Sequence, residues 1–321
     1  MVGWHLLLLL VIEVMLYGWV AWNVHANDGW GVPASIGLAI ALYVGLRIVL
    51  VGIEFVVARR KGGAMPGTAG EPLAGAAGMY VRELAGWLMM FSVVLPFTRA
   101  RHSVLDRPAR ASTAEYPVLL IHGLGCNRGN WAWFRRRLER RGHHVYTVDC
   151  TPPFARVGSY APQVARAVDE ILAATGAAQV VLIGHSMGGL VSRAYLDQYG
   201  DGKVRHVITL GTPHLGTWMT RLALGAGIRD MAEDSVWLTA LREREAARSS
   251  QPYAKFTCIY TWHDNLVTPQ SNAALPGAEN IALAGIGHMS LLLSGHTVDL
   301  VLGVLERLAD RVPGRAEPAI T

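Results

Sequence analysis

The chain has 321 residues, which leaves room for one domain of ordinary size and an additional segment. Apolar residues make up 51% of it and charged residues 17%, and the apolar excess lies before residue 100, so the first third differs from the rest. The net charge of +5 suits anionic lipid, whereas no zinc-finger spacing, aromatic RNA-binding motif or basic repeat supports a nucleic-acid partner. The three cysteines lack CxxC spacing, which argues against a disulfide framework or a zinc site and predicts small buried residues at Cys126, Cys150 and Cys258.

Two long apolar runs, residues 4–24 and 34–58, are separated by a short polar loop. Each run exceeds the roughly 18 to 20 residues that a helix needs to cross the hydrocarbon of a bilayer. The sequence therefore predicts a transmembrane helical hairpin over residues 1–60. A cleaved signal peptide is the alternative, because residues 24–26 resemble a cleavage site, but no Lys or Arg precedes the apolar core and Glu13 interrupts it.

Glu13 and Arg47 lie inside these runs, where an unpaired charge costs at least about 2.5 to 3.5 kcal/mol. Because Glu13 and Arg47 would lie at nearly the same depth in the hairpin, we expect them to form an ion pair. A basic cluster at 59–61 follows the second run, whereas the loop at 25–33 has no Lys or Arg. By the positive-inside rule both ends of the hairpin face the cytoplasm, which predicts a multi-pass protein of the bacterial inner membrane with the following domain on the cytoplasmic side.

A Gly/Ala/Pro-rich stretch, residues 62–78, is typical of a linker, and a third apolar run follows at residues 84–97. This third run is short for a membrane span. Basic residues flank it on both sides, namely Arg82, Arg99, Arg101, Arg107 and Arg110. They favour a helix that lies in the membrane interface, or against the next domain, over a third crossing that would move that domain to the opposite side. Residues 61–115 are therefore predicted to form a linker and an interfacial helix.

From residue 116 onward, short β-branched runs alternate with helical stretches, which predicts a mostly parallel sheet flanked by helices. The expected strands are residues 118–122, 144–149, 179–184, 204–210, 256–261 and 280–283. The expected helices are residues 131–141, 161–175 and 187–199. Ser159 is expected to cap the second of these helices, and Pro162 suits its first turn. The fold class is therefore α/β, preceded by two transmembrane helices.

The sequence Gly184-His185-Ser186-Met187-Gly188 lies directly between an expected strand and an expected helix. Small residues two positions before and after the serine allow a tight turn that lifts the hydroxyl clear of the sheet at a helix amino terminus. This strand-turn-helix context predicts Ser186 as a nucleophile. A coincidental tight turn is the alternative.

A nucleophilic serine requires a base, and the base requires an orienting acid. Where such a serine occupies a strand-turn-helix elbow, the acid and then the histidine follow it along the chain. Asp264 and His288 each follow a later strand in that order, so we predict His288 as the base and Asp264 as the acid. The alternative bases are His122, His185, His214 and His296, and the alternative acids are Asp230, Glu233 and Asp234.

The rival histidines each have a simpler interpretation. His122 and His185 neighbour backbone turns and are expected to serve local structure. His214 precedes the required acid, and His296 is expected to lie within the final helix.

Acyl transfer also requires backbone N–H groups that stabilise negative charge as it develops on the reacting carbonyl. Met187 follows the nucleophile, and Leu124 lies in the glycine-containing loop at 122–125 after the first strand. These two residues are the predicted oxyanion donors. An ordinary glycine turn is the alternative for the loop.

Together these motifs resemble those of bacterial lipases and esterases of the α/β-hydrolase superfamily. The resemblance covers about residues 116–305 and includes Gly-Thr-Pro-His-Leu-Gly at 211–216. It implies an α/β-hydrolase domain over residues 116–312, a Ser186–Asp264–His288 triad, and cleavage of lipid-like acyl esters through an acyl-enzyme. No metal or organic cofactor is implied, and no carboxylate cluster matches the calcium site of some bacterial lipases. The membrane hairpin departs from the secreted members, which makes extracellular fat digestion a poor fit.

Residues 214–251 form a lid-like insertion between strands whose apolar side chains could wall an acyl pocket or form ordinary core. They are Trp218, Met219, Leu222, Leu224, Ile228, Met231, Trp237 and Leu238. The partners that follow from this interpretation are a lipid or acyl-ester substrate and the bilayer. The alternatives are an acyltransferase or phospholipase with the same triad, and a non-catalytic membrane scaffold that keeps the fold.

Overall fold

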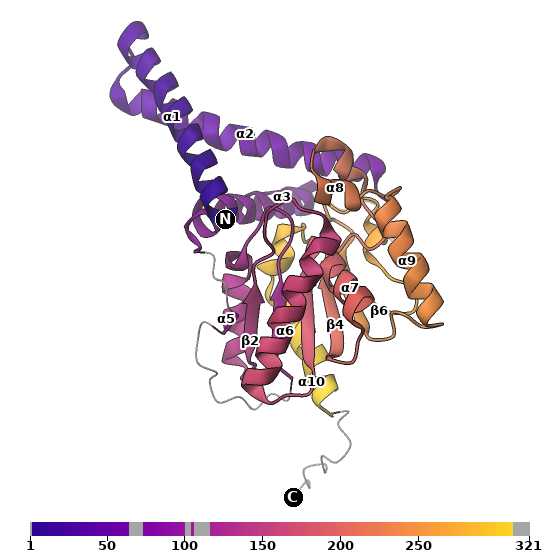
Figure 1. The fold of residues 1–321 in the computed structure, drawn as a ribbon. Coiled ribbons are helices and arrows are strands. Elements are labelled where there is room, and N and C mark those ends of the chain that lie inside the picture. Colours follow the sequence, from indigo (N-terminus) through magenta and orange to yellow (C-terminus); the bar gives the residue numbers. More distant parts are fainter. Residues whose placement is uncertain (1, 64–72, 100–103, 106–115, 311–321) are drawn as a thin grey trace, which may run out of the picture.

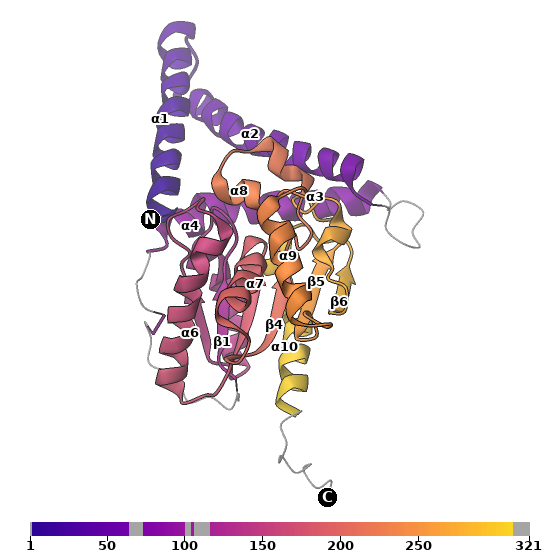
Figure 2. The ribbon, with the colours of Figure 1, turned by 45° about the vertical axis from the view of Figure 1, so that its right-hand side comes forward.

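The computed structural model describes residues 2–63, 73–99, 104–105 and 116–310. Three helical stretches precede the sheet: α1 (Val2–Asp28), α2 (Val32–Lys61), and a third formed by α3 (Leu73–Leu88), the π-helical turn η1 (Met89–Val94) and α4 (Leu95–Phe97). Within the described residues, Gly3–Asp28, Val32–Lys61 and Gly75–Phe97 are each long and apolar enough to cross a membrane. Figures 1 and 2 show α1 and α2 joined at their far end, with α2 and α3 crossing above the sheet.

The expected pair of charges is present between the first two helices. Arg47 Nη2 lies 2.5 Å from Glu13 Oε2, and both side chains are largely covered. The Arg47 guanidinium also lies 4.1 Å from the centre of the Tyr43 ring. The predicted Glu13–Arg47 contact is therefore confirmed, and it ties α1 to α2 midway along the hairpin.

The third helical stretch begins earlier than the sequence predicted. The expected linker at 62–78 overlaps α3, because Leu73–Leu88 is helical throughout. Its alanines have the highest intrinsic helix propensity, and the helix packs against both α2 and the sheet domain, so the small residues favour helix here. The rest of the expected linker, at 64–72, and the basic residues Arg101, Arg107 and Arg110 lie outside the described residues.

Six parallel strands form one sheet in the order β2-β1-β3-β4-β5-β6. Their bounds are β1 (Val118–Ile121), β2 (Val145–Val148), β3 (Val180–His185), β4 (Val204–Leu210), β5 (Phe256–Thr261) and β6 (Glu279–Leu283). Each end lies within one residue of its predicted position. The predicted α/β fold class is confirmed.

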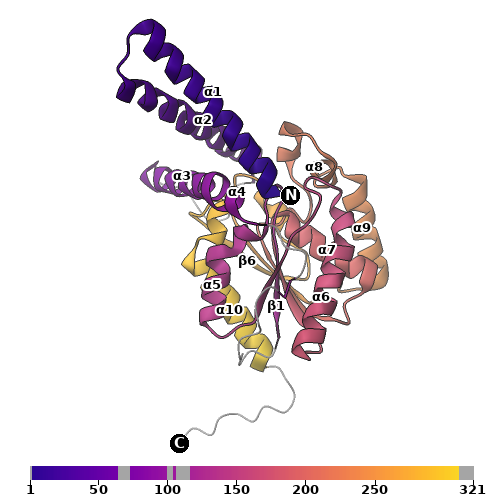
Figure 3. The ribbon, with the colours of Figure 1, turned by 60° about the vertical axis from the view of Figure 1, so that its left-hand side comes forward.

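Helices cover both faces of the sheet (Figure 3). On one face lie α6 (Ala161–Thr175) and α7 (Met187–Tyr199), and on the other lie α5 (Ala132–Arg140) and α10 (Gly295–Asp310). Alternate residues of β1 enter the two cores, Leu119 and Ile121 on the α6–α7 side and Val118 and Leu120 on the other. Because such a strand is buried on both faces, its sequence is a continuous apolar run rather than an alternation of apolar and polar residues.

Two local predictions about helix starts need correction. Ser159 does not cap α6, because its hydroxyl donates to the Arg156 carbonyl in a 3-10 turn (Val157–Tyr160) that precedes the helix. Pro162 does lie in the first turn of α6, as expected. Another 3-10 turn, η2 (Arg128–Trp131), occupies the predicted start of α5.

The insertion after β4 contains η4 (Trp218–Leu222), α8 (Ala226–Asp230) and α9 (Val236–Arg248). In Figures 1 and 2, α8 lies beside α2 at the end of the domain where the strands terminate. β2 lies on one side of β1, and β3 to β6 follow on the other side, so the direction in which successive strands are added reverses at β1. In such sheets, ligands bind in the crevice at the carboxyl ends of the two strands where this reversal occurs, which here are β1 and β3.

Removing one member of the Glu13–Arg47 pair leaves the other charge unpartnered between apolar helices. We expect Glu13→Gln and Arg47→Gln each to lower the unfolding temperature of the detergent-purified protein, and the double variant to lose less than the sum of the two. A coupling free energy of about 1 kcal/mol is expected for a close ion pair. Strictly additive losses would contradict a stabilising pair.

Candidate active site

Ser186 occupies a strained turn at the junction of β3 and α7. Its φ of 54° and ψ of −125° are rare for a residue with a side chain, and it is the amino-terminal cap of α7. A Cβ on Gly184 would lie 2.4 Å from the Gly189 nitrogen, and one on Gly188 would lie 2.1 Å from the Ile121 carbonyl oxygen. Both positions therefore require glycine, which accounts for the spacing of the motif around Ser186.

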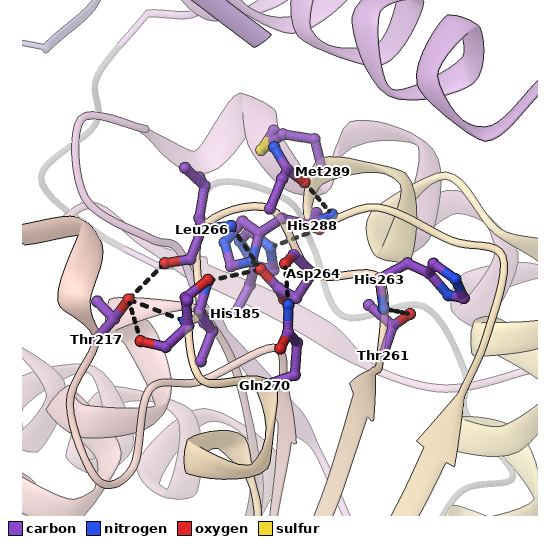
Figure 4. Close-up of polar contacts among 12 residues, drawn as sticks. His185, Thr217, Thr261, His263, Asp264, Leu266, Gln270, His288 and Met289 are labelled. Carbon is purple, nitrogen blue, oxygen red and sulfur yellow. Dashed lines mark hydrogen bonds and ion pairs between the residues drawn. The ribbon is translucent and has the colours of Figure 1, made fainter. Parts of the chain in front are cut away.

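The two predicted partners of the serine meet each other across adjacent strand ends (Figure 4). His288 Nδ1 lies 2.8 Å from Asp264 Oδ2 and 3.0 Å from Oδ1, and each side chain is 1% exposed. The Asp264 Oδ1 atom also accepts the backbone N–H groups of Leu266 and Val267, at 2.8 and 2.7 Å. Since a carboxylate only accepts, Nδ1 carries the hydrogen, which leaves Nε2 able to exchange a proton.

The electrostatic surroundings favour the charged form of the His288 ring. Burial by itself lowers the pKa of this imidazole, but the charge and hydrogen bonds of Asp264 outweigh it, and Glu83 and Glu54 act in the same direction. The pKa of His288 is raised above its ordinary value as a result.

A cavity of about 200 Å³ is lined by two of the three predicted catalytic residues. Ser186 and His288 both line it. No hydrogen bond joins the Ser186 hydroxyl to another described side chain, and the serine–histidine contact of such sites often tightens only with substrate bound. The apolar lining comes from the insertion, from the third helical stretch and from the strand ends, and includes Trp87, Phe91, Leu124, Met219, Ile228, Met231, Leu266 and Val267.

The predicted oxyanion donors flank the nucleophile. Met187 is the first residue of α7, where backbone N–H groups have no partner within the helix. Leu124 lines the cavity, and its neighbour Gly123 approaches so closely that a Cβ there would lie 3.0 Å from the Ser186 Cβ. Neither N–H donates a hydrogen bond to another described residue, so both are free to bind a developing oxyanion.

The alternative histidines have other roles. His122 Nδ1 donates to the Gly123 carbonyl at 2.8 Å and its Nε2 accepts the Cys150 N–H at 3.0 Å, so both ring nitrogens are occupied. His214 is fully buried beside Thr209, 2.9 Å from the hydroxyl oxygen, and burial lowers its pKa strongly. His296 lies in α10, as expected.

His185 is closer to the candidate base than the sequence indicated. Its ring centre lies 4.7 Å from that of His288, and its Nε2 lies 3.3 Å from the His288 carbonyl oxygen. Burial, followed by the charge of His288, lowers the His185 pKa strongly. The ring is therefore held neutral and supports His288 through packing and a hydrogen bond.

The alternative acids do not reach His288. Asp230 forms an ion pair with Arg156 at 3.1 Å and accepts the Val157 N–H at 2.9 Å. Glu233 accepts from Asn272 at 3.1 Å. Asp234 is exposed.

Of the eight apolar insertion residues, three line the cavity and five do not. Met219, Ile228 and Met231 line it. Leu222 and Leu224 are exposed, whereas Leu238 belongs to the core on the α6–α7 side. Trp218 and Trp237 are half-buried away from the cavity.

Residues that the sequence analysis missed come from the amino-terminal helices. Glu54 of α2 lines the cavity, and its carboxylate accepts from Asn265 at 2.7 Å. Glu83 of α3 accepts the Met289 N–H at 2.7 Å. Glu54 is a third charge in the two predicted spans, after Glu13 and Arg47, and such a charge is by itself a signal of function.

The chain is similar to known proteins in sequence and in fold. A family model for the alpha/beta hydrolase fold matches residues 116–225. Triacylglycerol lipases from Pseudarthrobacter phenanthrenivorans and Burkholderia plantarii are each 37% identical to the chain over 114 residues. These matches cover 33% of this chain and 35% and 32% of the two relatives, so the chain spans about a third of the length of each.

Solved structures show the same fold at lower identity. A mature lipase from Bacillus licheniformis superposes with a TM-score of 0.54 at 20% identity, covering 62% of this chain and 96% of that one. Lipase B from Aspergillus fumigatus gives a TM-score of 0.53 at 20% identity, covering 68% and 64%. The chain therefore has the α/β-hydrolase fold. A stretch of 114 residues is similar in sequence to the two triacylglycerol lipases.

The tight approach at Gly188 makes the elbow sensitive to a single methyl group. We expect Gly188→Ala to abolish modification of Ser186 by a fluorophosphonate and to destabilise the protein by about 2 kcal/mol or more, because the new Cβ has no room against Ile121. Gly202→Ala is the matched control, since a Cβ at Gly202 meets nothing within 4 Å. Normal modification and stability of Gly188→Ala would contradict the elbow geometry.

Proposed function

We propose that the protein is a membrane-anchored serine hydrolase that cleaves carboxylic esters of lipid-like acyl substrates through an acyl-enzyme. The observations that carry the proposal are the buried contact between His288 and Asp264 and the cavity that His288 shares with Ser186. A buried imidazole that is oriented by a carboxylate beside a strained serine is the arrangement that activates a hydroxyl for attack.

The proposed reaction uses only side chains and backbone of this chain. His288 Nε2 takes the Ser186 proton as the oxygen attacks the ester carbonyl, and Asp264 stabilises the imidazolium that forms. The N–H groups of Leu124 and Met187 bind the oxyanion. The imidazolium returns the proton to the leaving alcohol, and a water activated by His288 then releases the acid from Ser186.

The lining of the cavity supports an acyl substrate. Its surface is mostly apolar and includes the thioethers of Met219, Met231 and Met289 and the stacked pair Trp87 and Phe91. Flexible methionines accommodate chains of different shape. An acyl group bound among these side chains would place its carbonyl next to Ser186.

The apolar helices support an anchored enzyme. We propose that α1 and α2 cross the bilayer as a hairpin with both ends on the cytoplasmic side, where Arg59, Arg60 and Lys61 end α2. The third stretch, Gly75–Phe97, is also apolar enough to cross. Its Glu83 is fully buried against the hydrolase domain, which favours a helix in the membrane interface over a third span. A reporter fused to the carboxyl terminus distinguishes the two topologies.

An acyltransferase or a phospholipase with the same triad is the alternative within this chemistry. Both share the acyl-enzyme and differ in the acceptor or in the ester that is cleaved. A non-catalytic scaffold is the alternative outside it. The fully buried His288–Asp264 contact favours an enzyme, because a scaffold has no chemical requirement for an oriented imidazole beside a strained serine.

A fluorophosphonate probe tests the proposed nucleophile directly. We expect the full-length protein in detergent to be modified at Ser186. We also expect it to hydrolyse a series of aryl esters and to prefer esters with longer acyl chains over the acetyl ester. Ser186→Ala should lose the modification and reduce hydrolysis by about a thousandfold or more. Peptide mass spectrometry locates the modified residue.

Two controls separate the alternatives. Ser192→Ala removes a buried serine of α7, whose hydroxyl donates to the Gly188 carbonyl, and should leave the modification in place. Products formed with and without an added alcohol distinguish hydrolysis from acyl transfer. Folded protein that resists the probe would contradict the proposal and favour a scaffold.

A further inference from the structure

Glu83 of α3 holds the backbone directly after His288. Its Oε1 accepts the Met289 N–H at 2.7 Å, and its Oε2 accepts the N–H and the hydroxyl of Ser290 at 2.9 and 2.6 Å. The Glu83 side chain is fully buried. A Cβ on Gly287 would lie 2.4 Å from Glu83 Oε2, so the carboxylate occupies the space that a side chain would fill beside the histidine.

Glu54 of α2 reaches the other side of the same histidine through one intermediary. Its Oε2 accepts from Asn265 Nδ2 at 2.7 Å, and Asn265 Oδ1 accepts the His288 backbone N–H at 3.0 Å. Asn265 is fully buried and follows the candidate acid Asp264. The intermediary therefore connects a carboxylate of the hairpin to both loops that carry the candidate acid and base.

We propose that Glu54 and Glu83 are positioning residues for His288, so that the amino-terminal helices form part of the active site as well as an anchor. This inference rests on the proposed function, in which His288 is the base. Three consecutive backbone N–H groups, at residues 288, 289 and 290, are held directly or through Asn265 by these two carboxylates. Each of these hydrogen bonds fixes a backbone group beside His288, so together they restrict the loop that carries the imidazole.

The position of the imidazole determines the rate of proton transfer, because a small displacement of a catalytic group can slow a reaction strongly. Loss of either carboxylate should therefore lower kcat more than it raises KM. The charged and titratable groups that face His288 are Asp264 after β5, Glu83 on α3, Glu54 on α2 and His185 on β3. Both glutamates raise the pKa of His288.

The expected pH effect follows from the upward effect of both glutamates on the pKa of His288. His288 accepts a proton only when it is neutral, so activity falls as the pH drops through its pKa. Removing a negative charge that raises this pKa moves the acidic limb of the kcat/KM profile to lower pH. A merely structural role for either glutamate would leave the limb in place.

The test uses Glu54→Gln and Glu83→Gln in the full-length protein, purified in detergent and assayed with a soluble aryl ester. We expect kcat to fall about tenfold or more with KM changed less than about threefold, and the acidic limb to move to lower pH. Glu139→Gln is the matched control, because Glu139 lies on α5 with Arg135 as its partner, away from the cavity. It should leave kcat and the pH profile unchanged.

Three readouts keep the inference separate from the proposed function. Modification of wild-type Ser186 by the fluorophosphonate tests the nucleophile independently of both glutamates. Thermal unfolding shows whether each variant is folded, and if Glu83→Gln does not fold, the half-buried Glu54→Gln decides. The inference would be overturned if folded Glu54→Gln had the same kcat as the wild type and the same acidic limb, even with Ser186 modified normally.

Discussion

The hydrogen bonds between the His288 imidazole and the Asp264 carboxylate are the interaction on which the rest of the site depends. Both side chains are 1% exposed, and a buried carboxylate is costly unless its oxygens are satisfied. The imidazole and the Leu266 and Val267 N–H groups satisfy them, and in doing so they fix the loop after β5 and the orientation of the ring. The strained turn at Ser186 is useful only because this oriented base lines the same cavity.

The amino-terminal helices contribute to that site from outside the hydrolase fold. Trp87 and Phe91 line the cavity, and carboxylates of α2 and α3 bind the loops that carry the proposed acid and the proposed base. An anchor that only tethers a domain needs no such contacts. The structure therefore links the proposed substrate source, the bilayer, with the geometry of the proposed base through the same helices.

The features that the sequence predicts correctly are those that depend on short contiguous stretches of residues. The elbow motif occupies five consecutive residues, of which Gly184 and Gly188 leave no room for a Cβ. Strands β1 to β5 follow from apolar runs that are largely buried. The Glu13–Arg47 contact followed from equal depth in a hairpin. In contrast, Glu54 and Asn265 are 211 positions apart, and no local pattern predicts their contact. Alanine and glycine before residue 78 suited both a linker and a closely packed helix, and only tertiary contacts decide between the two.

The structure of a long-chain alkylphosphonate bound covalently to the full-length protein tests the central claim most directly. The phosphorus should be bonded to Ser186 Oγ, with one phosphonyl oxygen accepting from the Leu124 and Met187 N–H groups. The alkyl chain should lie against Trp87, Phe91 and Met219, in contact with the third helical stretch. An adduct on another residue, or a chain directed away from that stretch, would contradict an active site completed by the amino-terminal helices.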